Sequence, residues 1–381
     1  MLDSGTMSGV YIHIPFCKSK CHYCDFFSVT SADGLLGYGD LLLEELSLRC
    51  DYLDKKQIDT VYFGGGTPTL LLPGQLKVIL EQLRNRFEID KDAEITIEAN
   101  PDDLNPEVIQ QYRQIGFNRM SIGTQSFFDG HLKLMNRRHD AHQAIEAVKM
   151  SFEYGFDNIS LDLIYGIPGM TPGQWEHNLN MAASLPVDHI SAYHLSIEPG
   201  TRFGRQKRAG LFSEIPEEES AEQYRMLLGI LGANGFEQYE ISNFARHERY
   251  SRHNTKYWTG DSYLGLGPSA HSFNGNQRHW NPANLKTYTA DIRERKLPRG
   301  ENIDPLMHRN EYVMTRLRTA KGIVSVDFQA EFGEPEWLEL LNLAEKYIGK
   351  GYLILENGRI FFDKPSWFRS DGILSDLFMV R

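Results

Sequence analysis

The 381-residue sequence has few cysteines, no long apolar run and no excess of basic residues. Since no stretch of 18 consecutive apolar residues occurs, we expect no transmembrane helix. The first residues lack the basic start, apolar run and cleavage site of a signal peptide, which predicts a cytoplasmic location with reduced thiols. Lys and Arg number 40 against 51 Asp and Glu, and a formal net charge of −11 argues against nucleic acid as a partner.

Short apolar runs alternate with helical patterns over the first half of the chain. The runs are rich in Val, Ile, Tyr or Phe and end at Gly, Pro, Asn or Asp, which is typical of strands. This alternation predicts an α/β fold with a parallel sheet, either a partial barrel or an open doubly wound sheet. We expect strands at residues 10–14, 60–64, 94–99, 119–125, 158–165 and 189–197, and helices near 35–49, 73–87, 106–115, 140–154, 172–184 and 216–233.

The composition divides the chain into three parts. An α/β unit is expected at residues 1–240, a connecting segment rich in glycine and aromatic residues at 241–303, and a smaller, mainly helical unit at 304–381. In the last unit Asn357-Gly358 separates two apolar runs, which indicates a hairpin. Helices followed by a hairpin predict a winged-helix-like unit. Its glutamates favour a structural or substrate-covering role over DNA binding.

Three of the 4 cysteines, Cys17, Cys21 and Cys24, fall within eight residues just after the first predicted strand. Thiolates at this spacing can converge on one metal site. A structural zinc ion usually has four protein ligands, and the nearby histidines and Cys50 are poorly placed to supply the fourth. Three thiolates without a fourth ligand favour a [4Fe–4S] cluster with one open iron, and zinc is the alternative.

Polar residues recur at the ends of the later predicted strands. Gly64-Gly65-Gly66-Thr67 follows the second strand, where backbone N–H groups could meet a carboxylate. An internal ion pair such as Glu98 with Arg137 would explain one such residue. Several on successive strands favour a shared site at the carboxyl edge of the sheet. The members are Glu98, Gln125, Arg137 and Asp162.

The cysteine motif resembles that of the radical S-adenosylmethionine (radical SAM) superfamily. The resemblance implies a partial (β/α)6 barrel and a [4Fe–4S] cluster that binds and reduces SAM. Residues 11–17, 64–69, 123–127 and 162–169 resemble, more closely, the oxygen-independent coproporphyrinogen III oxidase family, and this likeness runs over most of the chain. It implies that SAM is contacted by Tyr11, Gly65, Gly66, Thr67, Glu98, Gln125, Arg137 and Asp162.

The chain departs from the oxidases in two places. Phe26 stands where the oxidase pattern Cys-x3-Cys-x2-Cys-x-Cys has its last cysteine. Only nine residues precede Val10, where the oxidases carry a longer segment. We therefore do not expect decarboxylation of coproporphyrinogen III, and whether the protein is an enzyme at all is left open.

A third motif, His-Asn-Thr-Lys-Tyr-Trp, begins at His253 and resembles the signature of HemW, the haem-chaperone branch of this family. The resemblance implies that haem is bound as cargo, with His253 as the iron ligand, and is delivered to haem-accepting proteins. A loop anchored by aromatic packing is the alternative, and His271 and His279 are rival ligands. We expect a cytoplasmic haem chaperone with an electron donor for its cluster, peripheral at the membrane during delivery. An oxidase or another SAM-dependent enzyme of porphyrin metabolism is the other candidate.

Overall fold

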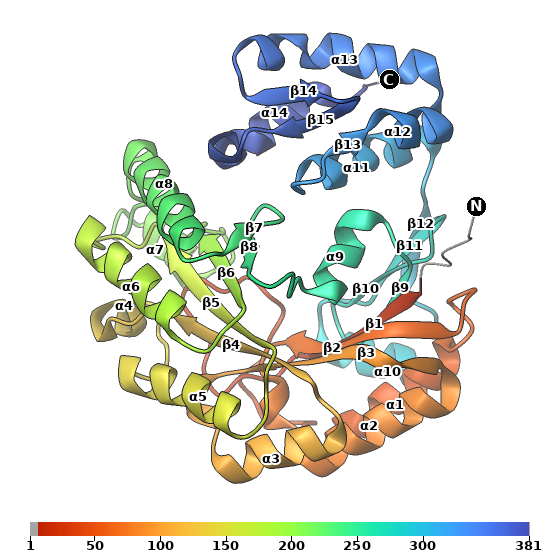
Figure 1. Cartoon of the computed structure of the whole chain (residues 1–381). Coiled ribbons are helices and arrows are strands. Elements are labelled where there is room, and N and C mark those ends of the chain that lie inside the picture. The colour runs from red at the N-terminus through yellow and green to blue at the C-terminus, as the bar shows by residue number, and fades with distance from the viewer. Residues whose placement is uncertain (1–6, 381) are drawn as a thin grey trace.

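A single large sheet runs through the computed structural model, which describes residues 7–380 (Figure 1). Residues 1–6, the start of the stretch that lacks signal-peptide features, lie outside these residues. The sheet has 12 strands in the order β12-β11-β10-β9-β1-β2-β3-β4-β5-β6-β8-β7. Its two end strands do not pair with each other, so the barrel is open.

Strands β1 to β6 pair in parallel with their neighbours and alternate with helices, which confirms the predicted partial (β/α)6 barrel. Every residue of β4 is buried, as expected of a strand covered on both faces. Proline begins α2, α3 and α6, where the missing N–H leaves no bond unmade. The strands are β1 (Ser8–Ile14), β2 (Gln57–Gly65), β3 (Glu88–Ala99), β4 (Arg119–Gln125), β5 (Ile159–Tyr165) and β6 (His189–His194). The helices are α1 (Tyr38–Arg49), α2 (Pro73–Arg86), α3 (Pro106–Ile115), α4 (Asp129–Leu134), α5 (Ala141–Glu153), α6 (Pro172–Ser184), α7 (Arg202–Arg208) and α8 (Glu217–Ala233).

The segment at residues 241–303 extends the sheet at both ends. Strand β9 pairs in parallel with β1, and β10 to β12 continue from it in antiparallel order. We expected only a connecting segment here, and helix α9, which lies between β8 and β9, was not predicted. Strand β7 (Glu237–Gln238) comes just before this segment and pairs with β8. The elements of the segment are β8 (Asn243–Ala245), α9 (Arg252–Thr259), β9 (Tyr263–Leu266), β10 (His271–Phe273), β11 (Gln277–Trp280), α10 (Leu285–Arg293) and β12 (Arg299–Asn302).

The C-terminal unit is a group of helices on a three-stranded sheet, in the order β13-β15-β14. The predicted hairpin is confirmed: Asn357 and Gly358 have φ of 51° and 71°, as a tight turn between antiparallel strands requires. Its elements are α11 (Pro305–Leu317), β13 (Ile323–Val324), α12 (Ser325–Phe332), α13 (Glu334–Gly349), β14 (Leu353–Glu356), β15 (Arg359–Phe362) and α14 (Ser370–Leu377).

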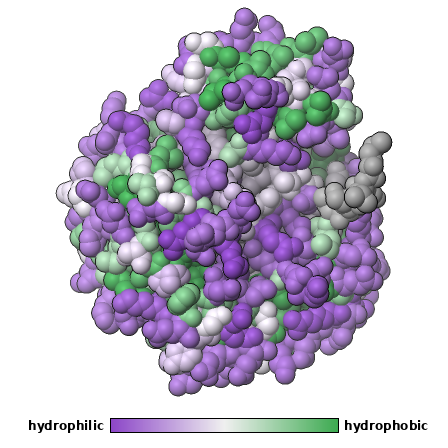
Figure 2. Space-filling model, in the orientation of Figure 1, coloured by the Kyte–Doolittle hydropathy of each residue, from purple (hydrophilic) through white to green (hydrophobic). Residues whose placement is uncertain are grey.

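The surface is largely hydrophilic in the view of Figure 2, with a hollow between the C-terminal unit and the barrel. None of the helices in residues 7–380 combines the length and apolar composition that crossing a bilayer requires.

Candidate functional site

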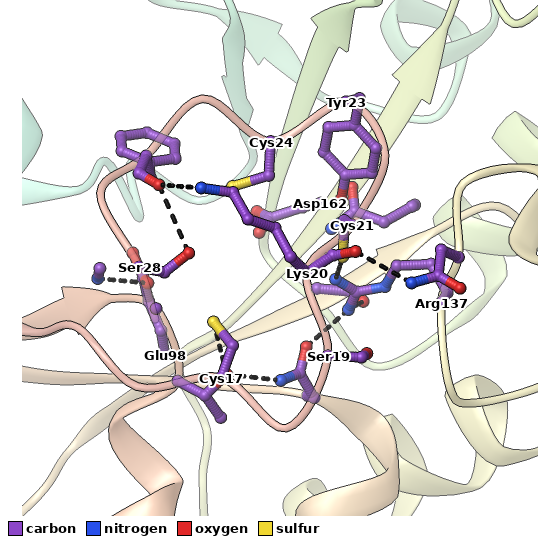
Figure 3. Close-up of a pocket in the computed structure, with 18 of the residues that line it drawn as sticks. Cys17, Ser19, Lys20, Cys21, Tyr23, Cys24, Ser28, Glu98, Arg137 and Asp162 are labelled. Carbon is purple, nitrogen blue, oxygen red and sulfur yellow. Dashed lines mark hydrogen bonds between the residues drawn. The ribbon is translucent and has the colours of Figure 1, made fainter. Parts of the chain in front are cut away.

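A cavity of about 620 Å³ opens at the carboxyl ends of β1 to β6. Its wall is built by the loop after β1, the glycine segment after β2 and the ends of the next four strands. Figure 3 shows the three cysteine side chains of the loop around a common space, with Arg137 beside Cys21. Ten of the predicted site residues line it: Cys17, Cys21, Cys24, Gly65, Gly66, Thr67, Glu98, Gln125, Arg137 and Asp162.

Main-chain hydrogen bonds fix the cysteine loop, one within the segment that joins β1 to α1 and one to the residue after α4. Cys17 N–H donates to Val29 O at 2.9 Å, and His22 N–H donates to Met135 O at 3.0 Å. Burial raises the pKa of Cys17, and burial together with the neighbouring Cys21 raises the pKa of Cys24 to about 11. A metal bound to these sulfur atoms would stabilise the thiolate forms that burial disfavours.

The donor set fits an iron–sulfur cluster better than a zinc ion. In the part of the chain that the structure describes, no three His, Cys, Asp or Glu side chains are gathered closely enough to hold one metal ion. Zinc needs its ligands about 2.0–2.3 Å from a single point. A cluster binds each cysteine through a different iron, so it accepts thiols that are spread around a larger space. Cys50 ends α1 and does not line the cavity.

The residue at the position of the oxidases' last cysteine is exposed at the cavity. Phe26 lines the cavity, and 70% of its surface is accessible. It brings no ligand atom, so the described loop offers three thiols to a cluster.

The glycine segment lies against the cysteine loop because it has no side chains there. A Cβ on Gly66 would stand 2.7 Å from Phe16 O and 3.0 Å from Cys17 Sγ. Gly65 has φ of +108°, and a Cβ there would meet the His13 ring at 2.6 Å. Only glycine allows this close approach. Thr67 follows, and its hydroxyl lies 3.6 Å from Cys17 Sγ.

Two partly buried carboxylates of β3 and β5 face the cavity. Burial raises the pKa of Glu98 to about 7, against a hydrogen bond from Tyr62 Oη to Glu98 Oε1 at 2.8 Å. Burial likewise raises the pKa of Asp162 to about 6, against hydrogen bonds from Ser191 and Ser121. Carboxylates kept in such surroundings gain most from a ligand that brings N–H or O–H donors or positive charge.

Arg137 supplies the positive charge of the same wall. Its Nη1 donates to Cys21 Sγ at 3.4 Å, and its Nη2 donates to Asn100 Oδ1 and Gly123 O, each at 2.6 Å. Its Nε is buried and has no hydrogen-bond partner among residues 7–380. A free donor beside the cysteines suits the carboxylate of a ligand. Gln125 stands on the same edge with φ of 69°, in the left-handed region.

The structure does not bring Tyr11 and His253 to this cavity. The Tyr11 hydroxyl forms its hydrogen bond inside the barrel, with His13 Nδ1 at 3.0 Å. His253 is 1% exposed, and its ring nitrogens lie 2.9 Å from Thr60 Oγ1 and 2.9 Å from Tyr257 Oη. An iron ligand must offer a free nitrogen to the metal, so the predicted haem ligation by His253 does not fit this arrangement.

Sequence patterns missed two residues of the site. Asn100 accepts from Arg137 and donates to Thr67 Oγ1 at 3.1 Å, so it links the two sides of the wall. Tyr62 donates to Glu98 from the middle of β2. A signal existed for Asn100, since it directly follows β3 before a proline. Tyr62 looks like any other aromatic strand residue.

A second cavity, of about 640 Å³, lies between the barrel and the C-terminal unit. One wall is the outer face of α9, with Thr255, Trp258 and Thr259. The other comes from α11 and α12, with Tyr312 and Arg316 on α11. Tyr239 and Tyr250 add two further rings, whose centroids are 4.5 Å apart.

Comparison with known proteins agrees with this geometry. Residues 11–182 match the radical SAM superfamily. The heme chaperone HemW of Bacillus subtilis is 35% identical over 86% of this chain and 87% of its own length. HemW of Escherichia coli is 32% identical over 93% of this chain and 96% of its own.

A solved structure of coproporphyrinogen III oxidase (HemN) from Escherichia coli has the same fold. It superposes with a TM-score of 0.85 over 98% of this chain and 90% of the oxidase, at 23% identity. The HemW relatives, by contrast, share about a third of their residues over most of their lengths. The chain therefore belongs to the HemW family of haem chaperones, within the radical SAM superfamily.

Proposed function

We propose that this protein is a haem chaperone that carries a [4Fe–4S] cluster and SAM. The observation that carries the proposal is the family itself: relatives named heme chaperone HemW match at 32–35% identity over 85% or more of the chain. Phe26 supports it, since the fourth thiol of the oxidase motif is missing from the exposed loop.

Cys17, Cys21 and Cys24 would hold the cluster, which when bound supplies one electron to the sulfonium of SAM. The free Nε of Arg137 would bind the SAM carboxylate. Glu98 and Asp162 would accept hydrogen bonds from its ribose or amine, while the bare glycine segment lets the ligand approach the main chain. Gln125 and Thr67 would complete this wall.

Haem would occupy the second cavity, between α9 and the C-terminal unit. Haem is a flat apolar disc, and this cavity presents aromatic rings from Tyr239, Tyr250, Trp258 and Tyr312. Several carboxylates also line it, so we place the two haem carboxylates on the side of Arg316 and Lys321. The His-Asn-Thr-Lys-Tyr-Trp motif contributes Trp258 to this haem site, and His253 is not proposed as an iron ligand.

The proposed function requires two kinds of partner, an electron donor and haem-accepting proteins. A one-electron donor would reduce the cluster, and haem-accepting proteins would receive the cargo. We propose a cytoplasmic location, with peripheral contact to the membrane during delivery.

The test compares two activities of the anaerobically reconstituted protein. Haem titration should give saturable binding, and the loaded protein should restore activity to an apo-form of a haem enzyme. Coproporphyrinogen III with SAM and a reductant should give no protoporphyrinogen IX. Sustained formation of protoporphyrinogen IX would establish an oxidase instead, and absence of saturable haem binding would overturn the chaperone.

A further inference from the structure

We propose that His253 is a positioning residue for the cofactor cavity, and that it acts through two tyrosines rather than by binding a ligand. The inference rests on the assignment of the first cavity to SAM and the cluster. It gives the third sequence motif a role inside the barrel, on the face of α9 opposite to the haem cavity.

Helix α9 is anchored to the barrel strands at its first turn. The main-chain N–H groups of Arg252 and His253 donate to the two oxygens of Glu94 on β3, each at 3.0 Å. Such bonds satisfy the free donors at a helix N-terminus. Lys256 forms an ion pair with Asp59 at 2.7 Å, with 6% and 15% of these side chains exposed. The position of the His253 ring is therefore set by the sheet.

One route leads from His253 to the SAM wall. Its ring stacks on Tyr62, with centroids 5.1 Å apart and planes inclined by 26°. The Tyr62 hydroxyl donates to Glu98 Oε1 at 2.8 Å, and Glu98 Oε2 accepts from Gly65 N–H at 3.1 Å. A shift of the Tyr62 ring would therefore move the carboxylate that faces the cavity.

The other route leads to the cysteine loop. Tyr11 also stacks on the His253 ring, at 6.3 Å and 28°. His13 Nε2 lies 2.9 Å from Phe27 O, and a carbonyl can only accept, so Nε2 carries the proton. His13 Nδ1 must then accept, and the Tyr11 hydroxyl donates to it at 3.0 Å. Phe27 follows the cysteines in the same loop, so this route supports the cluster side of the cavity.

His253 fits this role because it is neutral and fully partnered. Burial lowers its pKa to about 3, with further contributions from Lys256 and Arg119. An uncharged ring packs between tyrosines without the cost of burying an ion. Its hydrogen bonds to Thr60 and Tyr257 hold the ring plane in place.

The test is SAM affinity measured as a function of pH in the reconstituted protein. Tyr62→Phe keeps the ring and removes the donor to Glu98, so SAM binding should weaken by about tenfold, as for a lost hydrogen bond to a charged group. The midpoint of the pH profile should move upward, because that donor stabilises the ionised carboxylate. His253→Gln keeps polar contacts but loses the stacked ring, and should shift the midpoint in the same direction by a smaller amount.

Apart from Tyr62 on β2, which the test changes, the groups that act on Glu98 are Asp162 on β5 and Arg119 on β4, with Tyr11, Tyr193 and Tyr257 further away. These groups stay the same in Tyr62→Phe and His253→Gln, so the two pH profiles can be compared directly. Tyr112→Phe is the matched control. Tyr112 is a buried tyrosine of α3 that lies outside both routes. Loss of its hydroxyl should leave the SAM affinity and the pH midpoint unaltered.

The outcomes separate this inference from the site assignment. If Glu98→Gln and Tyr62→Phe both bind SAM like wild type, the assignment of the cavity fails. If they weaken binding but His253→Gln does not, the cavity stands and the positioning role is overturned. Loss of haem binding in His253→Gln with normal SAM binding would make His253 a haem ligand and would also overturn the positioning role. The double variant Tyr62→Phe/His253→Gln should shift the pH midpoint no further than Tyr62→Phe alone, because both changes reach Glu98 through Tyr62. Should His253→Gln not fold, Tyr257→Phe serves in its place, because it removes the hydroxyl that is hydrogen-bonded to the His253 ring. We expect a smaller upward shift of the pH midpoint, and an unshifted midpoint would overturn the positioning role.

Discussion

The cysteine loop and helix α9 carry the two most distinctive motifs of the chain, yet their side chains stand in opposite situations. The cysteines are partly buried and face a cavity of about 620 Å³. His253 is 1% exposed and both of its ring nitrogens have partners inside the protein. A motif residue ready to bind a ligand keeps unused bonding capacity, whereas one that is fully partnered supports its neighbours.

The same contrast applies to the charged groups of the two regions. Arg137 keeps a buried Nε without a partner, and Glu98 and Asp162 keep pKa values raised by burial. At α9 the comparable charges are paired, as Lys256 is with Asp59. Charged groups with bonding capacity left over at one cavity favour a ligand that supplies the missing partners.

The largest expected effect is loss of the cluster from the cysteine loop. Cys21→Ser should abolish bound iron after anaerobic reconstitution, because two thiolates cannot replace three. Cys50→Ser should retain the iron and sulfide of wild type. Iron and sulfide analysis of the two variants and wild type is the measurement. Equal loss in Cys50→Ser would contradict the three-ligand assignment, and zinc without iron in wild type would restore the zinc alternative.

The next effect is on SAM. Arg137→Ala should weaken SAM binding by about 1.5–3 kcal/mol, the range for a hydrogen bond to a charged group, while cluster content is kept. Isothermal titration with SAM measures it. Arg138→Ala is the control for charge. Arg138 also lines the cavity, but it is already paired with Asp102 and Asp103 at 2.8 and 3.1 Å. An affinity lowered equally in both variants would indicate a general charge effect rather than a bond from Arg137.

Most of the barrel was predictable because its signals are local. Six strands, their helices and the Asn357-Gly358 turn follow from alternation, proline placement and turn chemistry. The gathering of strand-end residues such as Glu98 and Asp162 followed from the rule that the carboxyl ends of parallel strands meet at one edge. Helix α9 was missed because it spans only Arg252–Thr259, although Ser251 and Gly260 mark its two caps.

The role of a residue was harder to predict than its position. His253 and Cys21 both belong to motifs of metal-binding residue types, and nothing in the sequence says which one is enclosed. Enclosure depends on contacts with residues far away in the chain, such as Thr60 and Glu94, and a local pattern does not contain them. The cavity between α9 and α11 depends likewise on how two units pack.

A smaller effect is expected at the haem cavity, on the outer face of α9. Trp258→Ala should weaken haem binding by about 1–1.5 kcal/mol, because a large ring packs on the disc. Haem titration followed by absorbance measures it, and SAM affinity should not change. His271→Ala is the control, since His271 lies on β10 and does not line this cavity. If His271→Ala loses haem and Trp258→Ala does not, the cargo site lies at the other end of the sheet.

The smallest effect is the pH dependence of SAM binding through Glu98. Its pKa is raised to about 7 by burial, so the carboxylate is mostly protonated at pH 6 and mostly ionised at pH 8. The ionised form accepts hydrogen bonds and attracts the positive charge of SAM, so affinity should rise with pH. Between pH 6.5 and 7.5 the ionised fraction of a group with pKa about 7 grows roughly threefold, which sets the size of the change. In the free protein the sign is opposite, since a raised pKa lowers the free energy of unfolding as pH rises toward 7. The amine of SAM titrates near this range as well, so the measured quantity is the difference between wild type and Glu98→Gln. If the difference in SAM affinity between wild type and Glu98→Gln does not change with pH, SAM does not interact with this carboxylate. The contrast between the open cavity and the closed face of α9 would then rest on Arg137 and the cysteines alone.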